Sequence, residues 1–566
     1  MTILGIHDGH NSTACLFKDG KIHWVLQEER LRHEKNFDGF PEKSILKILE
    51  LENLKPSDID AVVLNGNHQP KPMNRLERVD AYKKLAEKKN LLKSFLKKSS
   101  LVSNLYQDLN NQKRIQNLEN LGFDKKYVQF IEHHQAHAAA AYYAHNQFDD
   151  DVLVLTNDGA GDRICASISI GSQGKIKRLH EVHENHSIGL LYATFTFLTG
   201  MVPLEHEYKI MGMAPYADMK GARKVADAFH EMFSIKNDGL TWEFNKGTSV
   251  FGSIDFFKEF MYLKRFDHLM AGLQLFVEEF LTAWVKAAIR YTGIRKIALS
   301  GGTFMNVKAN KIIMELNEVD EIFVFPSCGD ESNAIGCAYE YYAKHANYRN
   351  IEKLGSIYFG VSFEDDAIKQ AYESYNFTHQ YTITHHEDIE KKSASILAEG
   401  HVLARFYGRE EFGARSLGNR AILGNPSSPE VIKTINELIK NRDFWMPFAS
   451  SILDSDIDKY VYTNTKDHPY YMIMTYDTKE AAKEIVGGIH PYDKTVRPQL
   501  VTHEHNASYW TLINEFKNLT GIGGVLNTSL NLHGLPLVYS PEDAFEVIEK
   551  SKLKYLAIGN YLIEKK

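Results

Sequence analysis

Three histidines lie within five positions of one short segment, FIEHHQAHAAAAYYA, and imidazoles at this spacing can bind a metal ion. His133 and His137 are four residues apart, and His134 and His137 are three residues apart. On a helix, residues at either spacing lie on one face about one turn from each other. The spacing therefore leaves both pairs open as ligands. A partly exposed polar edge of an alanine-rich helix is the alternative interpretation.

Two aspartates could complete such a site, because a divalent ion needs more ligands than two imidazoles. Asp158 lies in TNDGAGD and Asp330 lies in SCGDESNAIG, and each directly follows a predicted buried strand. With these two carboxylates available, we favour a metal site over the polar-edge interpretation. Two histidines and two aspartates with open positions suit iron(II), manganese or zinc, and the residue types do not choose among these metals.

A second group of polar residues, in the second half of the chain, could bind phosphate. The segment RFYGREEFGARSLGNRAILGNPSS places Arg405, Arg409, Arg415 and Arg420 around glycines, and the planar guanidinium group suits phosphate and carboxylate. Apolar residues alternate with the arginines, so we expect the segment to be partly buried and its arginines to have anionic partners. Further donors follow along the chain: Lys440, Arg442, Arg497, Asn527, Ser529 and Asn531. Together they predict a polyanion site.

Three predicted strands of the first half each end in a polar loop that carries glycine. The loops are Gly9–Ser12, Asp158–Asp162 and Ser300–Asn306. Glycine lets backbone N–H groups approach a phosphate closely, and helix N-termini favour negative charge. The layout resembles the actin/Hsp70/sugar-kinase superfold, in which such loops bind a nucleotide between two lobes.

The chain is too long for a single core, so at least two domains are expected. The polar segment HANYRNIEKLGS, residues 345–356, places a domain boundary near residue 350. Residues 69–126 are basic and helical in period, and we interpret them as a solvated helical excursion rather than a binding arm. A long amphipathic helix, LMAGLQLFVEEFLTAWVKAAIRYTG, is predicted to end at Gly293.

The composition favours small-molecule chemistry. The net charge is −7, which provides no basic footprint for nucleic acid and no reason to expect an anionic membrane surface. The start of the sequence lacks the pattern of a signal peptide, and the longest apolar stretch is too short and too interrupted to span a bilayer. Four cysteines without a CxxC pair are typical of a reduced, cytoplasmic protein.

Across nearly its whole length the sequence resembles the O-carbamoyltransferase family of the NodU/CmcH/TobZ type. The resemblance rests on ILGIHDGHNSTACL, QEERLRHEKNFDGFP, HHQAHAAAAYY, TNDGAGD, EYKIMGMAPY, ALSGGTFMNVKAN, GDESNAIG, GREEFGARSLGNRAIL and LNTSLN. It implies an α/β protein with two domains. Residues 1–350 would form a two-lobed domain of the actin/Hsp70/sugar-kinase type, similar to tRNA threonylcarbamoyladenosine synthase. Residues 351–566 would form an α+β domain similar to YrdC.

The resemblance also implies an activity. In this family the YrdC-like domain makes carbamoyl adenylate from ATP and carbamoyl phosphate, and the two-lobed domain transfers the carbamoyl group to a substrate hydroxyl. The acceptor would be a natural product, an antibiotic or a saccharide. Its identity leaves no readable motif.

Individual residues take roles from the same resemblance. It implies that the two histidines four positions apart are the ligands and that iron(II) is the ion. It also implies that His10 is the base that takes the proton of the acceptor hydroxyl. The implied metal ligands are His133, His137, Asp158 and Asp330. The implied nucleotide-binding residues are Gly301, Gly302, Asn306 and Lys209. The implied carbamoyl phosphate and ATP site comprises Arg415, Lys440, Arg442, Arg497, Asn527, Ser529 and Asn531, with magnesium as a further possible ion.

One position departs from the family pattern. Met446 stands where many members have an arginine that would touch phosphate, and Arg442 is a candidate to replace it.

Two other functions compete with carbamoyl transfer to a small molecule: a tRNA-modifying enzyme of the threonylcarbamoylation type, and an ATP-driven switch of the Hsp70 type. The acidic net charge disfavours the first, and the arginine-rich second half is unexplained by the second. Family resemblance also allows a homodimer.

Overall fold

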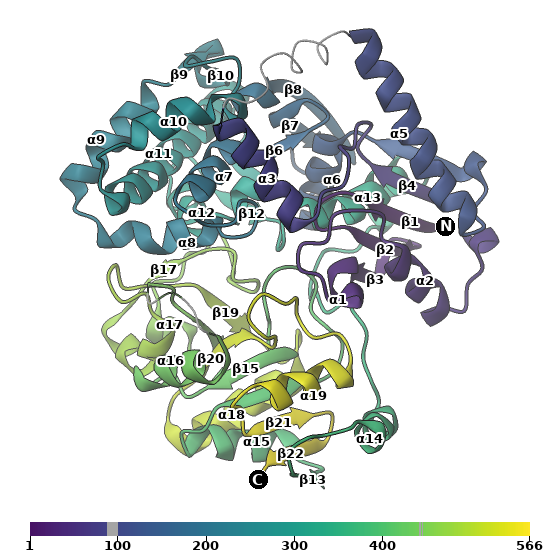
Figure 1. Cartoon of the computed structure of the whole chain (residues 1–566), viewed down its shortest axis with the longest axis vertical. Helices are drawn as coiled ribbons and strands as arrows, with labels where there is room; N and C mark the ends of the chain where they lie inside the picture. The colour runs from purple at the N-terminus through teal and green to yellow at the C-terminus, as the bar shows by residue number, and fades with distance from the viewer. Residues whose placement is uncertain (88–99, 441–442, 444) are drawn as a thin grey trace. The chain divides into compact units, whose positions relative to one another are not determined.

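The computed structural model describes residues 1–87, 100–440, 443 and 445–566, which form two compact units (Figure 1). The first unit contains Met1–Glu28 and Asn36–Leu354, and the second contains Glu29–Lys35 and Gly355–Lys566. The chain therefore passes from one unit to the other three times. In the described ranges, no helix combines the length and the apolar character needed to cross a membrane.

Two five-stranded sheets of the same topology form the centre of the first unit. In each sheet three consecutive strands pair antiparallel, and the first of them pairs in parallel with a fourth strand that is itself parallel to a fifth. In spatial order, the first sheet contains β3 (Lys21–Gln27), β2 (Thr13–Lys18), β1 (Thr2–His7), β4 (Ala61–Asn65) and β5 (Val128–Ile131). The second sheet contains β8 (Lys175–His183), β7 (Ile164–Ser172), β6 (Val152–Gly161), β11 (Lys296–Ser300) and β12 (Glu321–Val324). This repeat agrees with the predicted two-lobed α/β fold.

The first unit also contains helices, which pack around the two sheets, and a separate two-stranded hairpin. The helices are α2 (Glu42–Leu51), α3 (Arg75–Ala86), α5 (Ser100–Asn120), α6 (His133–His145), α7 (Ile188–Leu198), α8 (Glu207–Met213), α9 (Met219–His230), α10 (Ile254–Met261), α11 (Phe266–Thr292), α12 (Val307–Met314) and α13 (Asn333–His345). The hairpin comprises β9 (Phe233–Lys236) and β10 (Thr241–Phe244).

Helices α6 and α13 pack against each other between the two sheets, α6 on β6 and β11 and α13 on β1, β2 and β4 (Figure 1). Small residues make this close contact possible. A Cβ at Gly336 would lie 1.9 Å from the carbonyl oxygen of Ala136, and a Cβ at Gly5 would lie 2.0 Å from that of Ala334. Because real Cβ atoms do not approach so closely, these glycines fix the spacing of both helices. The N-terminal ends of α6 and α13 carry the predicted metal ligands His133, His137 and, just before α13, Asp330.

Helices α3 and α5 lie in the segment predicted as a solvated helical excursion, of which residues 88–99 lie outside the described residues. Most described side chains of the two helices are exposed or half-buried, but a few are buried against the unit. Arg78 and Tyr82 of α3 and Arg114 and Leu118 of α5 are buried. The guanidinium group of Arg114 donates to both carboxylate oxygens of Asp8, at 2.7 and 2.8 Å, and to the carbonyl oxygens of residues 65 and 66. A buried ion pair thus holds the excursion to the loop that follows β1.

Replacing Arg114 with methionine is expected to lower the free energy of unfolding by about 3–5 kcal/mol, because the substitution leaves the buried carboxylate of Asp8 without its partner. Urea denaturation followed by circular dichroism measures the effect. The control is Arg295→Met, which removes an exposed ion pair with Asp320 and should not shift the midpoint measurably. Equal midpoints for the two variants would contradict the structural role of Arg114.

Two further expectations concern strand and helix ends. The predicted long helix is α11, and Gly293 follows it with a left-handed φ of 74°, so the predicted end is confirmed. The segment expected to form a loop after residue 158 differs. Strand β6 continues through a bulge to Gly161, which still pairs with β7, and the turn consists of Asp162 and Arg163, both with positive φ.

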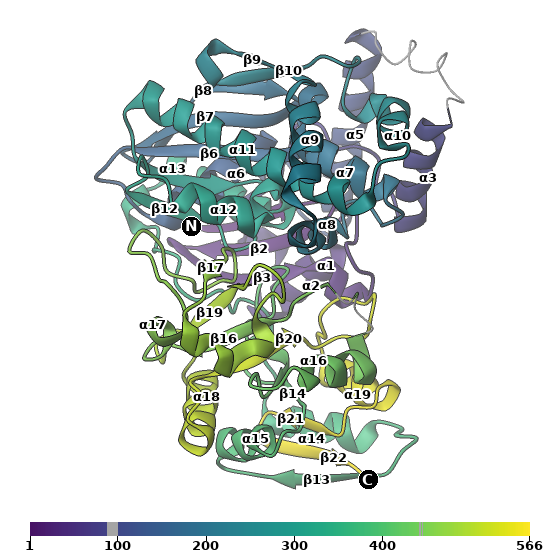
Figure 2. The same ribbon diagram turned by 90° about the vertical axis from the view of Figure 1, so that its left-hand side faces the viewer.

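An eight-stranded mixed sheet forms the second unit. Its strands, in spatial order, are β13 (Tyr381–His385), β22 (Tyr561–Lys565), β21 (Tyr555–Ile558), β14 (Leu403–Phe406), β15 (Arg420–Gly424), β20 (Gly524–Ser529), β16 (Ala449–Leu453) and β19 (Pro498–Val501). Figure 2 shows β13 and β22 at one edge of the sheet, near the C-terminus. A separate two-stranded ribbon consists of β17 (Tyr476–Asp477) and β18 (Thr495–Val496).

Both faces of this sheet are covered by apolar residues. Successive side chains of a strand point to opposite faces, and Ile422 and Leu423 accordingly belong to two different hydrophobic clusters. Helices α14 (Asp365–Ser374) and α19 (Pro541–Lys550) contribute to the first cluster, and α15 (Ile389–Ala398) and α18 (Ala507–Thr520) contribute to the second. The remaining helices are α1 (Glu28–Arg32), α16 (Glu430–Ile435) and α17 (Ile457–Tyr460).

Candidate metal centre and anion site

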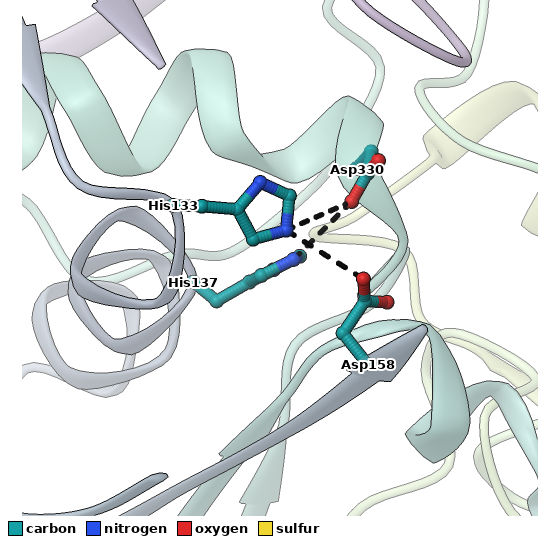
Figure 3. A group of neighbouring side chains, drawn as sticks. All are labelled: His133, His137, Asp158 and Asp330. Carbon is teal, nitrogen blue, oxygen red and sulfur yellow. Dashed lines mark ion pairs between the residues drawn. The ribbon is translucent and has the colours of Figure 1, made fainter. Parts of the chain in front are cut away.

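Four predicted metal ligands converge in the first unit. One ligand atom from each of His133, His137, Asp158 and Asp330 lies within 4.8 Å of the other three (Figure 3). Nε2 of His133 is 3.4 Å from Oδ1 of Asp330 and 3.6 Å from Oδ2 of Asp158, and Nε2 of His137 is 3.4 Å from the same Oδ1 of Asp330. These distances leave room for an ion between groups that do not bond each other directly.

Local structure explains how α6 presents its two histidines. The helix is rich in alanine, and the carboxylate of Glu132 caps it by accepting from the backbone N–H groups of His134 and Gln135. The carboxylate of Asp162 accepts from the backbone N–H of His133 at 2.8 Å. The imidazole of His133 packs on Gly161, where a Cβ would lie 2.1 Å from the ring. The last glycine of TNDGAGD is therefore needed for the position of His133.

The two carboxylates are also held by backbone contacts or by the fold. Oδ1 of Asp158, on β6, accepts from the N–H of Gly302 at 2.7 Å, which leaves Oδ2 directed at His133. Asp330 lies in the turn before α13, and its Oδ1 faces both histidines. The site therefore combines residues from the second sheet, from α6 and from the turn before α13.

The electrostatics of the four residues fit a cation. Nε2 of His133 and Oδ1 of Asp330 are buried atoms without a hydrogen-bond partner among the described residues, and such atoms are costly unless a ligand satisfies them. Burial lowers the pKa of His133, but the carboxylates of Asp330 and Asp158 overcome this and hold it well above the usual value. A positive charge at this place is thus stabilised, and a divalent ion would supply it.

The structure groups His133 and His137, but not His134, with the two aspartates. Both ring nitrogens of His134 bond protein atoms: Nδ1 is 2.7 Å from Oγ1 of Thr156, and Nε2 is 3.0 Å from the carbonyl oxygen of Ile164. His134 is fully buried and ties α6 to the second sheet. Neither of its ring nitrogens is therefore left for an ion.

His7, for which no role was predicted from the sequence, lies beside the four ligands. Its Nε2 is 2.9 Å from the carbonyl oxygen of His10 and 3.7 Å from Oδ2 of Asp330. The amide nitrogen of Asn65 lies 2.9 Å from Nδ1 of His7 and 3.2 Å from Nδ1 of His133. The presence of a second histidine three positions before His10, in HDGH, was the sequence signal that could have pointed to His7. His7 positions the backbone of the predicted base.

The predicted base, His10, is kept uncharged. Burial and the nearby charge of Arg78 lower its pKa to about 3, and the charge of Asp330 only partly opposes them. Its Nδ1 is buried without a hydrogen-bond partner in the part of the chain that the structure describes. A neutral imidazole with an unused nitrogen is able to accept a proton.

The predicted nucleotide loop follows β11. Gly301 has φ 103°, and a Cβ there would lie 2.3 Å from the carbonyl oxygen of residue 157, so the turn requires glycine. The side chain of Asn306 caps α12 and bonds Gln274, which holds the loop in place. Lys209 is half-buried on α8. Contact of these residues with a nucleotide stays a prediction.

In the second unit the structure brings together three residues of the predicted anion site. Lys440 ends a π-helical turn that follows α16 and is 4% exposed. Its Nζ donates to Oγ of Ser529 at 3.2 Å and to the backbone and side-chain oxygens of Asn531. Ser529 is the last residue of β20, and Asn531 follows two positions later. A cation, a hydroxyl group and an amide therefore meet in one place.

The other predicted residues of this site lie on segments joined by a buried polar network. The amide of Asn527 donates to the carbonyl oxygen of residue 416, next to Arg415, and to Oγ of Ser451. The hydroxyl of Ser451 donates to the side chain of Gln499, two residues after Arg497. The amide of Asn527 thus holds these segments together. Arg415 and Arg497 are half-buried. Arg442 lies outside the described residues.

Three of the four arginines expected to have anionic partners are bonded to several groups of the protein itself. Arg405 donates to the carbonyl oxygen of Gly418, Arg409 to two backbone carbonyls, and Arg420 to four backbone carbonyls. The guanidinium of Arg420 also lies 3.6 Å above the ring of Phe406. Arg420 also lies beside the buried carboxylates of Glu410 and Glu411, so the protein itself supplies the anionic partners expected for it. Phosphate binding by these arginines stays a prediction.

A residue that the sequence analysis missed shapes the loop that carries Arg415. The carboxylate of Glu411 is fully buried. It accepts from the backbone N–H groups of Leu417, Asn419 and Arg420 at 2.7, 3.2 and 3.1 Å. Hydrogen bonds to a charged acceptor are the stronger kind, so Glu411 fixes the course of residues 413–420, which we call the anion loop.

Comparison with known proteins agrees with both halves of this description. Family models described as Carbamoyltransferase N-terminus and Carbamoyltransferase C-terminus match residues 2–339 and 394–565. An uncharacterised protein of Methanocaldococcus jannaschii is 31% identical over 100% of this chain and 99% of its own length. Nodulation protein NolNO of Sinorhizobium fredii is 29% identical over 98% of this chain and 79% of its own length. A solved structure of full-length HypF in its phosphate- and nucleotide-bound form has a TM-score of 0.32 at 15% identity, and the match covers 61% of this chain and 55% of that chain. The chain belongs to the carbamoyltransferase family and is a carbamoyltransferase.

Proposed function

We propose that the chain is an ATP-dependent O-carbamoyltransferase that works in two half-reactions. In the second unit, water converts carbamoyl phosphate into carbamate and inorganic phosphate. A carbamate oxygen then attacks the α-phosphorus of ATP, so that pyrophosphate leaves and carbamoyl adenylate forms. In the first unit, the oxygen of an acceptor hydroxyl attacks the carbamoyl carbon and the bond to AMP breaks. The products are AMP and a carbamate ester of a small molecule or sugar.

The group of Lys440, Ser529 and Asn531 carries this proposal. A nearly buried ammonium group that faces hydroxyl and amide oxygens is suited to an incoming phosphate, because a low local dielectric strengthens its attraction for negative charge. Arg415 and Arg497 lie on segments connected to this group through Asn527 and would add guanidinium donors. The separate His/Asp cluster of the first unit supplies a second place for chemistry, as two half-reactions require.

The cluster of His133, His137, Asp158 and Asp330 would hold the metal ion, for which iron(II) is our first candidate. A divalent ion bound there would act as a Lewis acid on the carbamoyl carbonyl or on a nucleotide phosphate. Because Asn65 and the hydroxyl groups of Ser300 and Ser332 contact the Nδ1 atoms of the two histidines, the imidazole rings are oriented before any ion arrives. Magnesium would accompany ATP.

His10 would accept the proton of the acceptor hydroxyl as the new C–O bond forms. An alcohol is a poor nucleophile at neutral pH and needs a positioned base. The buried, unpaired Nδ1 of His10 supports this role, and His7 holds the backbone that carries it. The low pKa of His10 keeps the imidazole neutral but opposes the role by making the ring a weak base.

Purified chain incubated with ATP and radiolabelled carbamoyl phosphate tests the whole proposal. Pyrophosphate and inorganic phosphate should appear in equal amounts, and a panel of sugars and other alcohols should yield a labelled carbamate ester together with AMP. ADP in place of pyrophosphate would favour a switch of the Hsp70 type. Labelling or gel retention of bulk tRNA would favour a tRNA-modifying enzyme.

Replacing His10 with alanine is expected to lower the rate of carbamoyl transfer by about 10²–10⁴-fold, the usual contribution of a general base. Pyrophosphate release should remain, since the Lys440 group lies in the other unit. The control is His230→Ala on α9, whose imidazole pairs with Glu279 away from the cluster and whose loss should change neither half-reaction. A variant at position 10 that keeps full transfer would remove His10 from the role of base.

A further inference from the structure

One residue of the N-terminal sequence lies in the interior of the second unit. Residues 29–35 belong to that unit, although they precede its main part by more than 300 positions. Within them, Arg30 on α1 is 3% exposed. Its guanidinium lies 2.9 Å from Oε1 of Glu410 and donates to the carbonyl oxygens of Glu411 and Gly413 at 2.6 and 2.7 Å.

Arg30 completes a buried group of four charges. The other members are Glu410, Glu411 and Arg420, and each of the four is at most 3% exposed. Burial raises the pKa of Glu410, and the charges of Arg30 and Arg420 oppose this rise. Two positive and two negative charges balance only when Arg30 is present. The second unit therefore depends on a side chain from outside residues 355–566.

The contacts of Arg30 are placed where they determine the geometry of the anion loop. It bridges the carbonyl oxygens at the loop's entry, positions 411 and 413, with two nitrogens of one planar group. The side chain of Glu411 in turn accepts from the N–H groups of Leu417, Asn419 and Arg420. Fixing the backbone of Glu411 therefore fixes the carboxylate that organises the rest of the loop, including the position of Arg415.

We infer that Arg30 is a positioning residue for the anion loop of the second unit. It touches no substrate and acts by holding Glu411 and Gly413, so that Arg415 is presented to phosphate in one geometry. The consequence for catalysis rests on the function proposed above. The ordering of the loop does not depend on that function and can be measured separately.

Two variants separate positioning from simple charge balance. Arg30→Lys keeps a cation opposite Glu410, but an ammonium group lacks the planar fork that bridges two carbonyl oxygens. The double variant Arg30→Met with Glu410→Gln removes both charges of the pair and leaves groups of similar volume, so it avoids an unpaired buried carboxylate. If Arg30 only balanced charge, both variants would retain the native loop.

The first measurement is hydrogen–deuterium exchange of the full-length protein, read on peptides that cover residues 413–420. Positioning predicts that both variants exchange at least about tenfold faster there than the wild type, which corresponds to about 1.4 kcal/mol. Peptides from α6 in the first unit and the metal content of the protein should not change. Wild-type exchange at residues 413–420 in both variants would overturn the inference, whether or not the protein turns out to make carbamoyl adenylate.

The second measurement is the rate of pyrophosphate release at varied concentrations of carbamoyl phosphate. We expect KM for carbamoyl phosphate to rise at least tenfold in Arg30→Lys, with a smaller change in KM for acceptor. Arg265→Met, at an exposed ion pair with Asp267, serves as the control with unchanged constants. Faster exchange with an unchanged KM would overturn the link to phosphate binding. A wild type without pyrophosphate release would instead refute the proposed function, and exchange would still decide the role of Arg30.

Discussion

Replacing His133 with alanine is expected to empty the metal centre of the first unit, whereas replacing His134 leaves the centre loaded. Nε2 of His133 faces Asp158 and Asp330, while both nitrogens of His134 bond Thr156 and Ile164. We expect metal per chain, measured by inductively coupled plasma mass spectrometry, to fall at least about tenfold in His133→Ala, since outer partners alone change affinity by about 10–100-fold. Transfer should fall by about 10²–10³-fold, the scale of one lost electrostatic stabiliser.

The His134→Ala protein is the matched control for this experiment, because it removes the neighbouring imidazole from the same turn of α6. It should lose thermal stability, since a buried contact between α6 and the second sheet disappears, but it should keep its metal. Equal metal loss from the two variants would refute the assignment of the pair four residues apart. Full metal content in both would refute the site itself.

Replacing Lys440 with methionine is expected to abolish adenylate formation while the metal centre stays intact. The substitution keeps the length and the packing of the aliphatic stem but removes the charge that faces Ser529 and Asn531. Loss of one buried charge that stabilises a transferring phosphoryl group costs about 10²–10³-fold in rate. Pyrophosphate release from ATP and carbamoyl phosphate is the measurement.

Lys459→Met is the control for that variant. Lys459 belongs to the same unit and pairs with Glu484, but its side chain is 38% exposed, so its loss should leave pyrophosphate release unchanged. Metal content should equal that of the wild type in both proteins. Pyrophosphate release that survives in Lys440→Met at more than a tenth of the wild-type rate would exclude the Lys440 group as the adenylate-forming site.

Residues at regular spacing or at loop tips could be predicted from the sequence, because their positions follow from local geometry. His133 and His137 share a helix face, Asp158 lies near the end of β6 and Asp330 lies in the turn before α13, and all four contribute to one cluster. The choice between His134 and His133 could not be made from spacing. It depends on Thr156 and Ile164, which come from the second sheet, and no local pattern reports such contacts.

The arginines of the second half show a different limit. Burial of Arg405 and Arg420 was correctly expected, but the sequence did not show how much of their bonding the protein itself provides. Arg420 combines backbone carbonyl oxygens with the nearby carboxylates of Glu410 and Glu411, and Arg405 bonds one backbone carbonyl and two side-chain oxygens. The sequence does not tell which carbonyls a loop will turn inward. For the same reason the sequence does not show that the carboxylate of Glu411 bonds several backbone N–H groups of one loop.

The insertion of residues 29–35 into the second unit has a consequence for the order of events during synthesis. Arg30 and Glu411 are 381 positions apart in the chain. A ribosome adds about 5–20 residues per second, so roughly 20–80 s pass between the synthesis of Arg30 and that of its partner. During this interval the first unit can begin to fold. Residues 29–35 are already synthesised, but the residues that will bury the guanidinium group of Arg30 are not. The last part of the protein to be made therefore closes around one of the first.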